Sequence, residues 1–529
     1  MNSNNGMQKR MLIMTLVVFA FFLAYEFLVL KPQQEAKLKE QAAQSQNVTH
    51  ANQAPVQEAQ APALGTPAGI QAPDSNAIAS KNIASVIKTN KSIYEIDTLG
   101  RIAQVTLQES KYINEEANQI KLFDANQLRP LEVRFSDANV NDEAFKVNVV
   151  ANQSQIDATQ EKQVLVLTQN LSTTTVTKTI TFYPDGHYDV TVNTSTPQSF
   201  FMTTGFRPNV LADMYADHGA LLKLNDGTLT TLLDGDMDKT VNLTGIKFAS
   251  AFDRYYTTVL YNFETSMAVS VMKDSNNDPQ MFIQGNTNLT VSGYAGPKEH
   301  ILLKSLNPEL VDVIEYGFFT FIAKPMFTFL AFLQGYIGNW GWTIVVLTII
   351  IKLILYPLSY KGMVSMQKLK ELAPKIKDIQ AKYKDDKQKQ SAQMMELYKK
   401  HGANPMGGCL PLILQIPVFF AIYRVLLNSI ELKGAEWIFW IHDLAEMDPY
   451  FVLPILMGAS MYLQQKLTPN TLQDEMQKKI FQFLPVVFTF FFLWFPAGLT
   501  LYWFINNVFT IGQQYYINTL FEKQKATKK

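Results

Sequence analysis

A single lysine, Lys352, lies in the middle of an apolar run that covers residues 342–358 (WTIVVLTIIIKLILYPL). An ammonium group at the midplane of a bilayer costs about 2.5 to 3.5 kcal/mol on insertion scales, so it is expected to face protein or water. Counted from Trp340 at about 1.5 Å per residue, Lys352 lies roughly 18 Å into a hydrocarbon core about 30 Å thick. The position predicts a functional charge within a membrane. The alternative is a side chain that extends along its stem to the interface.

Other polar residues accompany this lysine at helical spacing. Thr348 precedes it by four residues and Ser359 follows it by seven, so all three are predicted to share one stripe that lines a wet cavity. The last apolar segment has a polar face of its own, made of Thr500, Trp503, Asn506, Asn507, Thr510 and Gln513. This face either meets the Lys352 stripe across the cavity or packs through hydrogen bonds between helices. Gln415 adds polarity to a third segment.

The chain contains no motif for catalysis or nucleotide binding. It has no P-loop, no His-Glu-x-x-His motif and no Gly-x-Ser-x-Gly turn. His442 and Glu446 stand four residues apart, but two ligands do not make a metal site. We therefore expect a protein that is not an enzyme and that uses no cofactor and no metal.

Apolar segments that can position these polar residues occur at the N-terminus and in the last two fifths of the chain. Residues 11–30 follow Lys9 and Arg10 and lack a cleavage pattern, which predicts an uncleaved transmembrane anchor after a cytoplasmic N-terminus at residues 1–10. Five further spans are predicted, at residues 340–360, 409–427, 450–464, 480–495 and 498–516. The third and fourth of these are short, so either they thin the local bilayer or their polar flanks complete the span. The predicted fold class is a multi-domain membrane protein with an α-helical core of five transmembrane helices.

The region between the anchor and the core has a different character. Residues 31–75 are rich in Ala, Gln and Pro, which predicts a flexible linker. Residues 76–307 alternate in short strands, expected at 102–107, 145–150, 162–168 and 174–183, with a Pro-Asp-Gly hairpin turn at 184–186. This pattern predicts a large antiparallel β-sandwich. Residues 308–338 are aromatic and partly amphipathic, which indicates an interfacial helix before a core at residues 339–521.

Loop charge sets the expected orientation. Residues 362–408 carry ten lysines against five acids, and residues 522–529 form a short basic tail. Positive loops face the cytoplasm, so both termini are expected there and the β-domain in the periplasm of an inner membrane. The lysine-rich segment is predicted to be a helical hairpin. Its apolar residues either join its two helices or offer an adaptable docking surface; they include Met366, Leu369, Met394 and Met395.

Long blocks of the core resemble the YidC/Oxa/Alb family of membrane protein insertases, and specifically its Gram-negative YidC type. The matching blocks are GNWGWTIVVLTIIIKLILYPLSYK, NPMGGCLPLILQIPVFFAIY, WIHDL, DPYFVLPILMG and FFLWFPAGLTLYWFINN. The resemblance implies a hydrophilic groove with one positive charge, at the position of Lys352, where most members have arginine. Thr348, Tyr502 and Trp503 match groove residues that contact substrate in the family.

The resemblance also implies partners and a function. The chain is expected to act as an insertase and chaperone that releases nascent membrane proteins into lipid, alone or with the Sec translocon. Its hairpin and tail are similar to regions that receive ribosomes or targeting factors, and its β-domain is similar to sugar-binding sandwiches. The predicted groove consists of Lys352, Thr348, Ser359, Gln415, Tyr502, Trp503 and Asn506. The alternatives are a transporter or channel for a small anion and a structural assembly factor.

Overall fold

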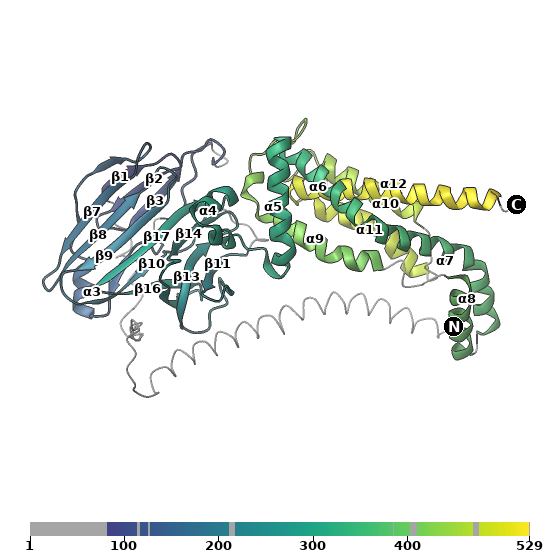
Figure 1. The fold of residues 1–529 in the computed structure, drawn as a ribbon, viewed down its shortest axis with the longest axis horizontal. Helices are drawn as coiled ribbons and strands as arrows, with labels where there is room; N and C mark the ends of the chain where they lie inside the picture. Colours follow the sequence, from purple (N-terminus) through teal and green to yellow (C-terminus); the bar gives the residue numbers. More distant parts are fainter. Residues whose placement is uncertain are drawn as a thin grey trace. The chain divides into compact units, whose positions relative to one another are not determined.

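The computed structural model describes residues 82–113, 117–124, 127–210, 217–384, 386–402, 410–468 and 475–527. The predicted N-terminus, anchor and linker, residues 1–75, lie outside the described residues, as does Cys409. The chain divides into two compact units, of which the first ends at Ile314 and the second begins at Glu315. We call them the β unit and the helical unit (Figure 1).

The β unit consists of two sheets. The smaller sheet has the strand order β3 (Ile102–Leu107), β2 (Ser92–Asp97), β1 (Ile83–Lys88) and β6 (Gln155–Asp157). The path of the larger sheet is β4 (Val133–Phe135), β10 (Ser199–Thr203), β16 (Pro279–Asn286), β15 (Met267–Lys273), β13 (Val241–Phe252), β14 (Tyr256–Tyr261), β17 (Asn288–Pro297), β9 (Tyr188–Thr194), β8 (Thr175–Phe182), β7 (Gln163–Asn170) and β5 (Val150–Ala151). Strands β11 (Gly219–Leu224) and β12 (Leu229–Leu233) extend it from β13.

The two sheets face each other across an apolar core. The hydroxyl of Tyr94 on β2 donates to the carbonyl of Ala295 on β17 over 3.2 Å, and its ring is fully buried. Side chains alternate between buried and half-buried along β8, as expected for strands with one face on a core. The prediction of an antiparallel sandwich fails at one pair, because β1 and β6 run parallel. Between these two strands the chain forms β2, β3, β4, the helix α3 (Ala138–Ala144) and β5, a connection long enough for β6 to run in the direction of β1.

Three of the four predicted strands are confirmed, as β3, β7 and β8. The hairpin after β8 is also confirmed, and Gly186 has the positive φ of 89° that such a turn favours. The strand expected at 145–150 is wrong apart from its last residue. Asp137 caps α3 by accepting two backbone N–H groups, and the N–H of Phe145 bonds back to Asn141, so this stretch closes a helix.

The predicted interfacial helix begins later than expected. Residues Pro308–Val313 form a 3-10 turn, η4, that belongs to the β unit after α4 (His300–Leu306). Its acids hold it there, because Asp312 and Glu309 each lie 2.7 Å from Lys223 on β11. The helix itself, α5, covers Thr320–Ile337 after a short turn, η5 (Gly317–Phe319).

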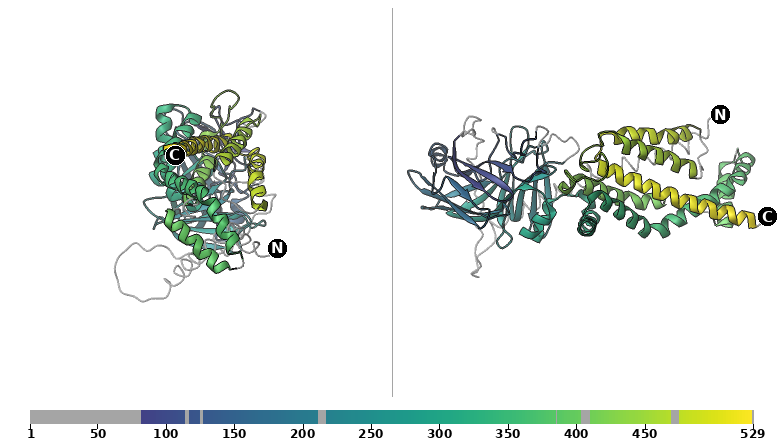
Figure 2. Two further views of the ribbon diagram at one scale, coloured as in Figure 1. Left: turned by 90° about the vertical axis from the view of Figure 1, so that its right-hand side faces the viewer. Right: turned by 90° about the horizontal axis from the view of Figure 1, so that it is seen from above.

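The helical unit then continues with seven more helices among the described residues (Figures 1 and 2). They are α6 (Trp340–Ile354), α7 (Tyr356–Lys382), α8 (Lys387–His401), α9 (Leu410–Asn428), α10 (Val452–Leu467), α11 (Glu475–Phe492) and α12 (Ala497–Thr527). Helix α12 packs against α6, α7, α9 and α10, so it is the central element of this unit. It runs to Thr527, so most of the predicted tail at residues 522–529 is helical.

The first predicted span of the core is bent. Helix α6 ends at Ile354, and α7 leaves it at an angle of 63°. Pro357, in the first turn of α7, has no N–H to give to the carbonyl of Leu353 and crowds that turn, which breaks a helix. In the described part of the chain, no helix taken singly has both the length and the apolar composition to cross a bilayer, whereas α6 and α7 meet that test together.

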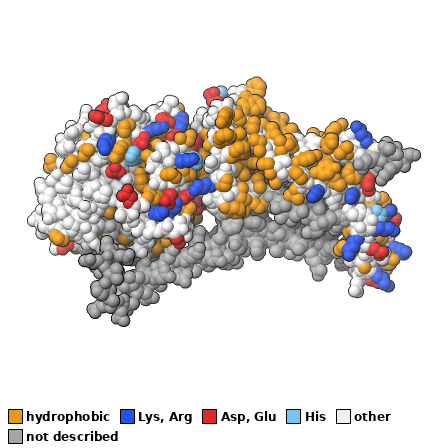
Figure 3. Space-filling model, viewed as in Figure 1, with side chains coloured by type: hydrophobic (Ala, Val, Ile, Leu, Met, Phe, Trp, Pro, Cys, Tyr) orange, Lys and Arg blue, Asp and Glu red, His pale blue; other side chains and the backbone are white. Residues whose placement is uncertain are grey.

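The surfaces of the two units differ in chemistry. On the face drawn in Figure 3, hydrophobic side chains cover much of the helical unit, whereas the β unit shows mainly polar and charged groups. The exposed apolar side chains include Phe321, Phe332 and Tyr336 on α5 and Phe483, Val486, Phe490 and Phe491 on α11.

Candidate functional site

Lys352 lies on the buried face of α6. It is 6% exposed, whereas the next two residues, Leu353 and Ile354, are 57% and 71% exposed. The helix therefore directs its one charged side chain inward and apolar side chains outward, the reverse of an amphipathic helix in water. This face packs against α12, and Ile344 and Thr348 lie on it too. The lysine does not extend to an exposed interface.

The ammonium group of Lys352 is bound by a hydroxyl rather than by an acid. Its Nζ donates to Oγ1 of Thr510 on α12 over 2.9 Å, and that hydroxyl donates in turn to the backbone carbonyl of Asn506 over 2.7 Å. Among the described residues, no carboxylate lies within ion-pair distance of Lys352. The ammonium group is thus buried and hydrogen-bonded, and no acid of the described residues neutralises it.

Helix α9 joins the same arrangement. Nε2 of Gln415 donates to Oδ1 of Asn506 over 2.9 Å. The side chains of Lys352, Thr510, Asn506 and Gln415 therefore connect α6, α12 and α9, and we call these four residues the polar cluster. Helices in lipid use such hydrogen bonds to associate, and a groove uses them to hold water and polar ligands. The cluster brings together three of the predicted groove residues.

Three other predicted groove residues lie nearby but play different parts. The hydroxyl of Thr348 is buried and donates to the carbonyl of Ile344 on its own helix over 2.7 Å. Ser359 lies on α7 beyond the bend, so its spacing from Lys352 no longer places both on one helical face. Tyr502 is buried, at 2% exposure. The stripe predicted from Thr348 to Ser359 is therefore interrupted.

Trp503 belongs to an aromatic group rather than to the polar cluster. Its ring lies 4.7 Å from that of Phe419 on α9, 5.1 Å from Phe492 and 5.6 Å from Phe488 on α11, measured between centroids. We call these four residues the aromatic cluster. Phe419 follows Gln415 by four residues on α9, and Trp503 precedes Asn506 by three residues on α12, which is about one helical turn in each case. The polar cluster is thus bordered by these rings.

Most of the apolar stripe of the hairpin joins α7 to α8. Leu369, Leu372 and Ile376 form a buried group, with Met366 and Met394 packed against it. Of the four hairpin residues predicted as contacts, only Met395 is exposed, at 53%. Asp386 caps α8 at the turn of the hairpin by accepting the N–H of Lys389. The structure thus favours the internal use of the stripe.

Thr510 belongs to the polar cluster but not to the predicted groove set, and Gln513 follows it on the same helix. Both belong to the polar face of the last segment, at four and seven residues after Asn506. That spacing was the available signal, because residues i, i+4 and i+7 share one side of a helix. Gln513 is 7% exposed, and neither polar atom of its side chain has a hydrogen-bond partner in the part of the chain that the structure describes.

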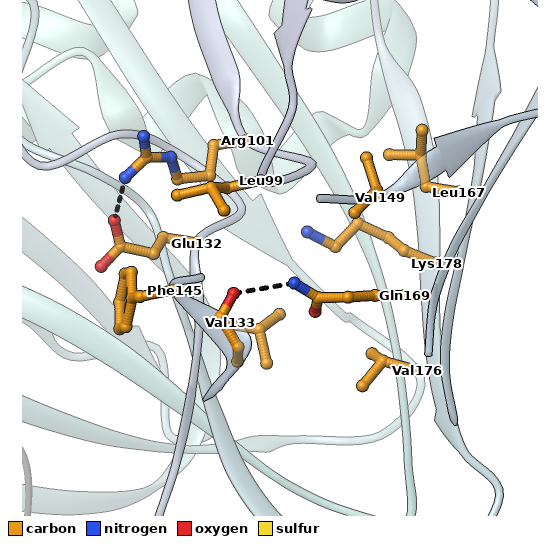
Figure 4. A pocket seen from close by; sticks show the side chains of 11 residues that line it. Leu99, Arg101, Glu132, Val133, Phe145, Val149, Leu167, Gln169, Val176 and Lys178 are labelled. Carbon is orange, nitrogen blue, oxygen red and sulfur yellow. Dashed lines mark hydrogen bonds and ion pairs between the residues drawn. The ribbon is translucent and has the colours of Figure 1, made fainter. Parts of the chain in front are cut away.

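A pocket in the β unit gathers further charged groups (Figure 4). Nζ of Lys178 points to the side that carries Arg101 and Glu132, and it donates to the carbonyls of Gly100 and Leu131 over 2.6 Å each. Burial lowers the pKa of Lys178 to about 8. Arg101 pairs with Glu132 at 2.9 Å and with Asp97 at 2.8 Å. Arg101, Asp97 and Glu132 thus pair with one another and Lys178 is held by backbone carbonyls, as in a structural network.

Two family models match the chain. The model described as 60Kd inner membrane protein matches residues 332–525, and the model described as YidC periplasmic domain matches residues 229–329. The first match contains the polar cluster and the second lies mostly in the β unit.

Named relatives match over the full length. The membrane protein insertase YidC of Campylobacter jejuni is 50% identical over 530 residues, which cover 100% of this chain and 99% of the relative. That of Wolinella succinogenes is 49% identical over 98% of this chain and 96% of the relative. A crystal structure of an active YidC insertase with its first transmembrane domain resolved is 19% identical, with a TM-score of 0.37, over 83% of this chain and 96% of that one.

Proposed function

Since this chain belongs to the YidC family of membrane protein insertases, we propose that its polar cluster receives the polar end of a nascent membrane protein. Membership of the family accounts for the β-rich periplasmic domain and the helical core. The observation that carries the assignment of the site is the buried charge of Lys352, which is held by Thr510 and by no acid among the described residues. An acidic substrate segment supplies the missing counter-charge.

The strength of this attraction follows from the surroundings of the lysine. Two unit charges 4 Å apart interact by about 1 kcal/mol in water and by about 4 kcal/mol at an effective dielectric constant near 20. The apolar residues around Lys352 and the aromatic cluster exclude part of the water, so one cation is sufficient. Asn506 and Gln415 hydrate or hydrogen-bond the substrate's other polar groups.

Release into lipid follows from the apolar surface of the helical unit. Exposed aromatic and aliphatic side chains on α5 and α11 provide a face that lipid covers. Moving some 20 apolar residues of the substrate from water into lipid releases enough free energy to drive insertion without a nucleotide. The step involves no covalent chemistry. The membrane potential assists outward movement of an acidic segment.

The topology and partners of the chain form the finer part of the proposal. The lysine-rich hairpin and both termini face the cytoplasm, the β unit lies in the periplasm, and five helices and the N-terminal anchor cross the inner membrane. The hairpin and the end of α12 contact ribosomes or targeting factors through exposed lysines such as Lys370, Lys377 and Lys400. The β unit and α5 contact the Sec translocon.

The proposal is tested by insertion of a short single-span protein with an acidic tail into liposomes that contain the purified chain. Wild type is compared with Lys352→Ala and Lys352→Arg. We expect insertion by wild type and by Lys352→Arg, and at least tenfold less by Lys352→Ala, because only the charge is essential to the attraction.

Lys361→Ala is the matched control, because Lys361 is an exposed lysine of α7 beyond the bend. If the position of the charge matters, Lys361→Ala inserts the substrate as well as wild type does. Equal insertion by all four proteins contradicts the role of Lys352. No insertion by wild type contradicts the function itself in the absence of a further partner.

A further inference from the structure

Gln513 differs from every member of the polar cluster because it is buried without a partner among the described residues. Neither its Nε2 nor its Oε1 has a hydrogen bond within that part of the chain, although the side chain is only 7% exposed. Buried amides are hydrogen-bonded in the great majority of cases, and an unpaired one lowers stability. The adjacent Gln514 shows the usual arrangement, since its Nε2 donates to Asn518 over 2.9 Å.

The position of Gln513 continues the polar cluster along α12. It follows Thr510 by three residues and so lies about 4.5 Å farther along the helix axis on the same side. Helix α7 packs against α12, and Gln367 on α7 is also buried, with an Oε1 that no described residue contacts by a hydrogen bond. A second buried carboxamide with a free acceptor thus lies on a neighbouring helix of the same core.

The chemistry of a free carboxamide indicates its ligand. The side chain of Gln513 offers two N–H donors and one carbonyl acceptor and carries no charge. A peptide unit has the matching acceptor and donor, and the end of a spanning segment has backbone groups that its own helix does not satisfy. In lipid such groups need a partner within the protein. A carboxylate ligand would leave the acceptor of Gln513 unpaired.

We infer that Gln513 is a binding residue for the substrate backbone, next to the charge site of Lys352. The inference rests on the proposed function and deepens it. Lys352 selects the charge of the incoming tail, whereas Gln513 holds a peptide unit whatever the tail's side chains are. The two residues therefore act on different features of one substrate.

The test measures insertion into liposomes of two single-span proteins that differ only in the tail, one acidic and one with amides in place of the acids. The full chain is used as wild type, Gln513→Leu, Gln514→Leu and Lys352→Ala. We expect Gln513→Leu to slow the insertion of both substrates by the same factor, about threefold to tenfold, as for the loss of one or two hydrogen bonds. Lys352→Ala slows only the acidic substrate.

Thermal unfolding of the same four proteins separates binding from structure. Leucine at position 513 removes an unsatisfied buried amide, so the Tm stays equal to that of wild type or rises. Gln514→Leu lowers the Tm because it removes the donor to Oδ1 of Asn518. A binding residue thus loses function without losing stability, which a structural residue does not do.

Three results overturn the inference. They are equal insertion by Gln513→Leu and wild type, a defect of Gln513→Leu confined to the acidic tail, and a Tm of Gln513→Leu below that of wild type. Each leaves the proposed function standing if wild type inserts both substrates. Failure of wild type to insert either one tests that function separately.

Discussion

The β unit and the helical unit each bury lysine, but they treat the charge in opposite ways. In the β unit, Lys178 is held by two backbone carbonyls and lies beside a network in which Arg101 contacts both Asp97 and Glu132. In the helical unit, Lys352 is held by the hydroxyl of Thr510 alone among the described residues. A satisfied charge fixes a fold, whereas an unsatisfied one is available to a ligand.

The difference predicts opposite responses to substitution. Removal of one member of a satisfied network leaves the others buried and unpaired, so stability falls sharply. Removal of an unpaired charge leaves nothing behind that needs a partner, so stability is kept and binding is lost. Variants in the two units therefore test whether substitution lowers stability in the β unit and binding in the helical unit.

The largest effect is expected for Asp97→Asn in the β unit. Asp97 is fully buried and accepts hydrogen bonds from Arg101 and from Arg129. Loss of its charge should lower the free energy of unfolding by about 3 to 5 kcal/mol, measured by calorimetry of the intact protein. Asp142→Asn is the control, because its pair with Lys146 is exposed and should contribute less than about 1 kcal/mol. Similar effects of the two variants would contradict the structural role of the network.

Lys178→Met should lower the free energy of unfolding by about 1 to 3 kcal/mol at neutral pH, because two buried carbonyls lose their donor. The folded protein releases the proton of Lys178 near pH 8, since its pKa is lowered from 10.5 to about 8. The unfolded chain keeps that proton to higher pH, so wild type becomes more stable as the pH rises above about 8. Lys178→Met should lack this rise in pH-dependent denaturant titrations, and a rise that persists would assign it to another group.

Lys352→Met should show the reverse pattern. The free energy of unfolding should change by less than about 1 kcal/mol or increase, because a buried charge is replaced by an apolar chain of similar length. Insertion of an acidic-tailed protein should fall about tenfold. Tryptophan fluorescence can follow unfolding, since all six tryptophans lie between residues 340 and 503. A large loss of stability would make Lys352 a structural residue like Lys178.

The smallest effect is expected for Thr510→Val, which removes the hydroxyl that holds Lys352. Insertion of the acidic-tailed protein should fall about threefold, because one hydrogen bond of modest net strength is lost. Thr500→Val provides the comparison, because Thr500 is buried on the same helix and bonds only to the carbonyl of Pro496 in the described contacts. An equal loss for both variants would indicate a general effect on α12.

Three residues of the polar cluster could be predicted from the sequence, whereas the position of Ser359 and the contact of Thr348 could not. A charge inside an apolar run identifies Lys352, and helical spacing on the last segment identifies Asn506, because both signals are local. Ser359 is separated from them by the bend at Leu355, which spacing alone does not show. The hydroxyl of Thr348 donates to the backbone of its own helix, and the surrounding side chains determine this orientation.

The β unit was predictable as a class and not in its details. Alternation and a turn sequence identify β8 and its hairpin, since both depend on neighbouring residues. The pair of Arg101 and Glu132 joins positions 31 residues apart, and no pattern in the sequence predicts it. The parallel pairing of β1 with β6 likewise depends on a crossover whose path the strands alone do not determine.

The bend after α6 also changes the electrostatics of Lys352. Peptide dipoles add along a helix to about half a negative charge at its C-terminal end, and this effect fades beyond the last turn. Because Pro357 ends α6 so early, Lys352 falls within that last turn. A straight helix would have left the lysine in mid-helix, without this partial charge. The proline thus gives the ammonium a weak backbone counter-charge, which under the proposed function a substrate carboxylate would replace.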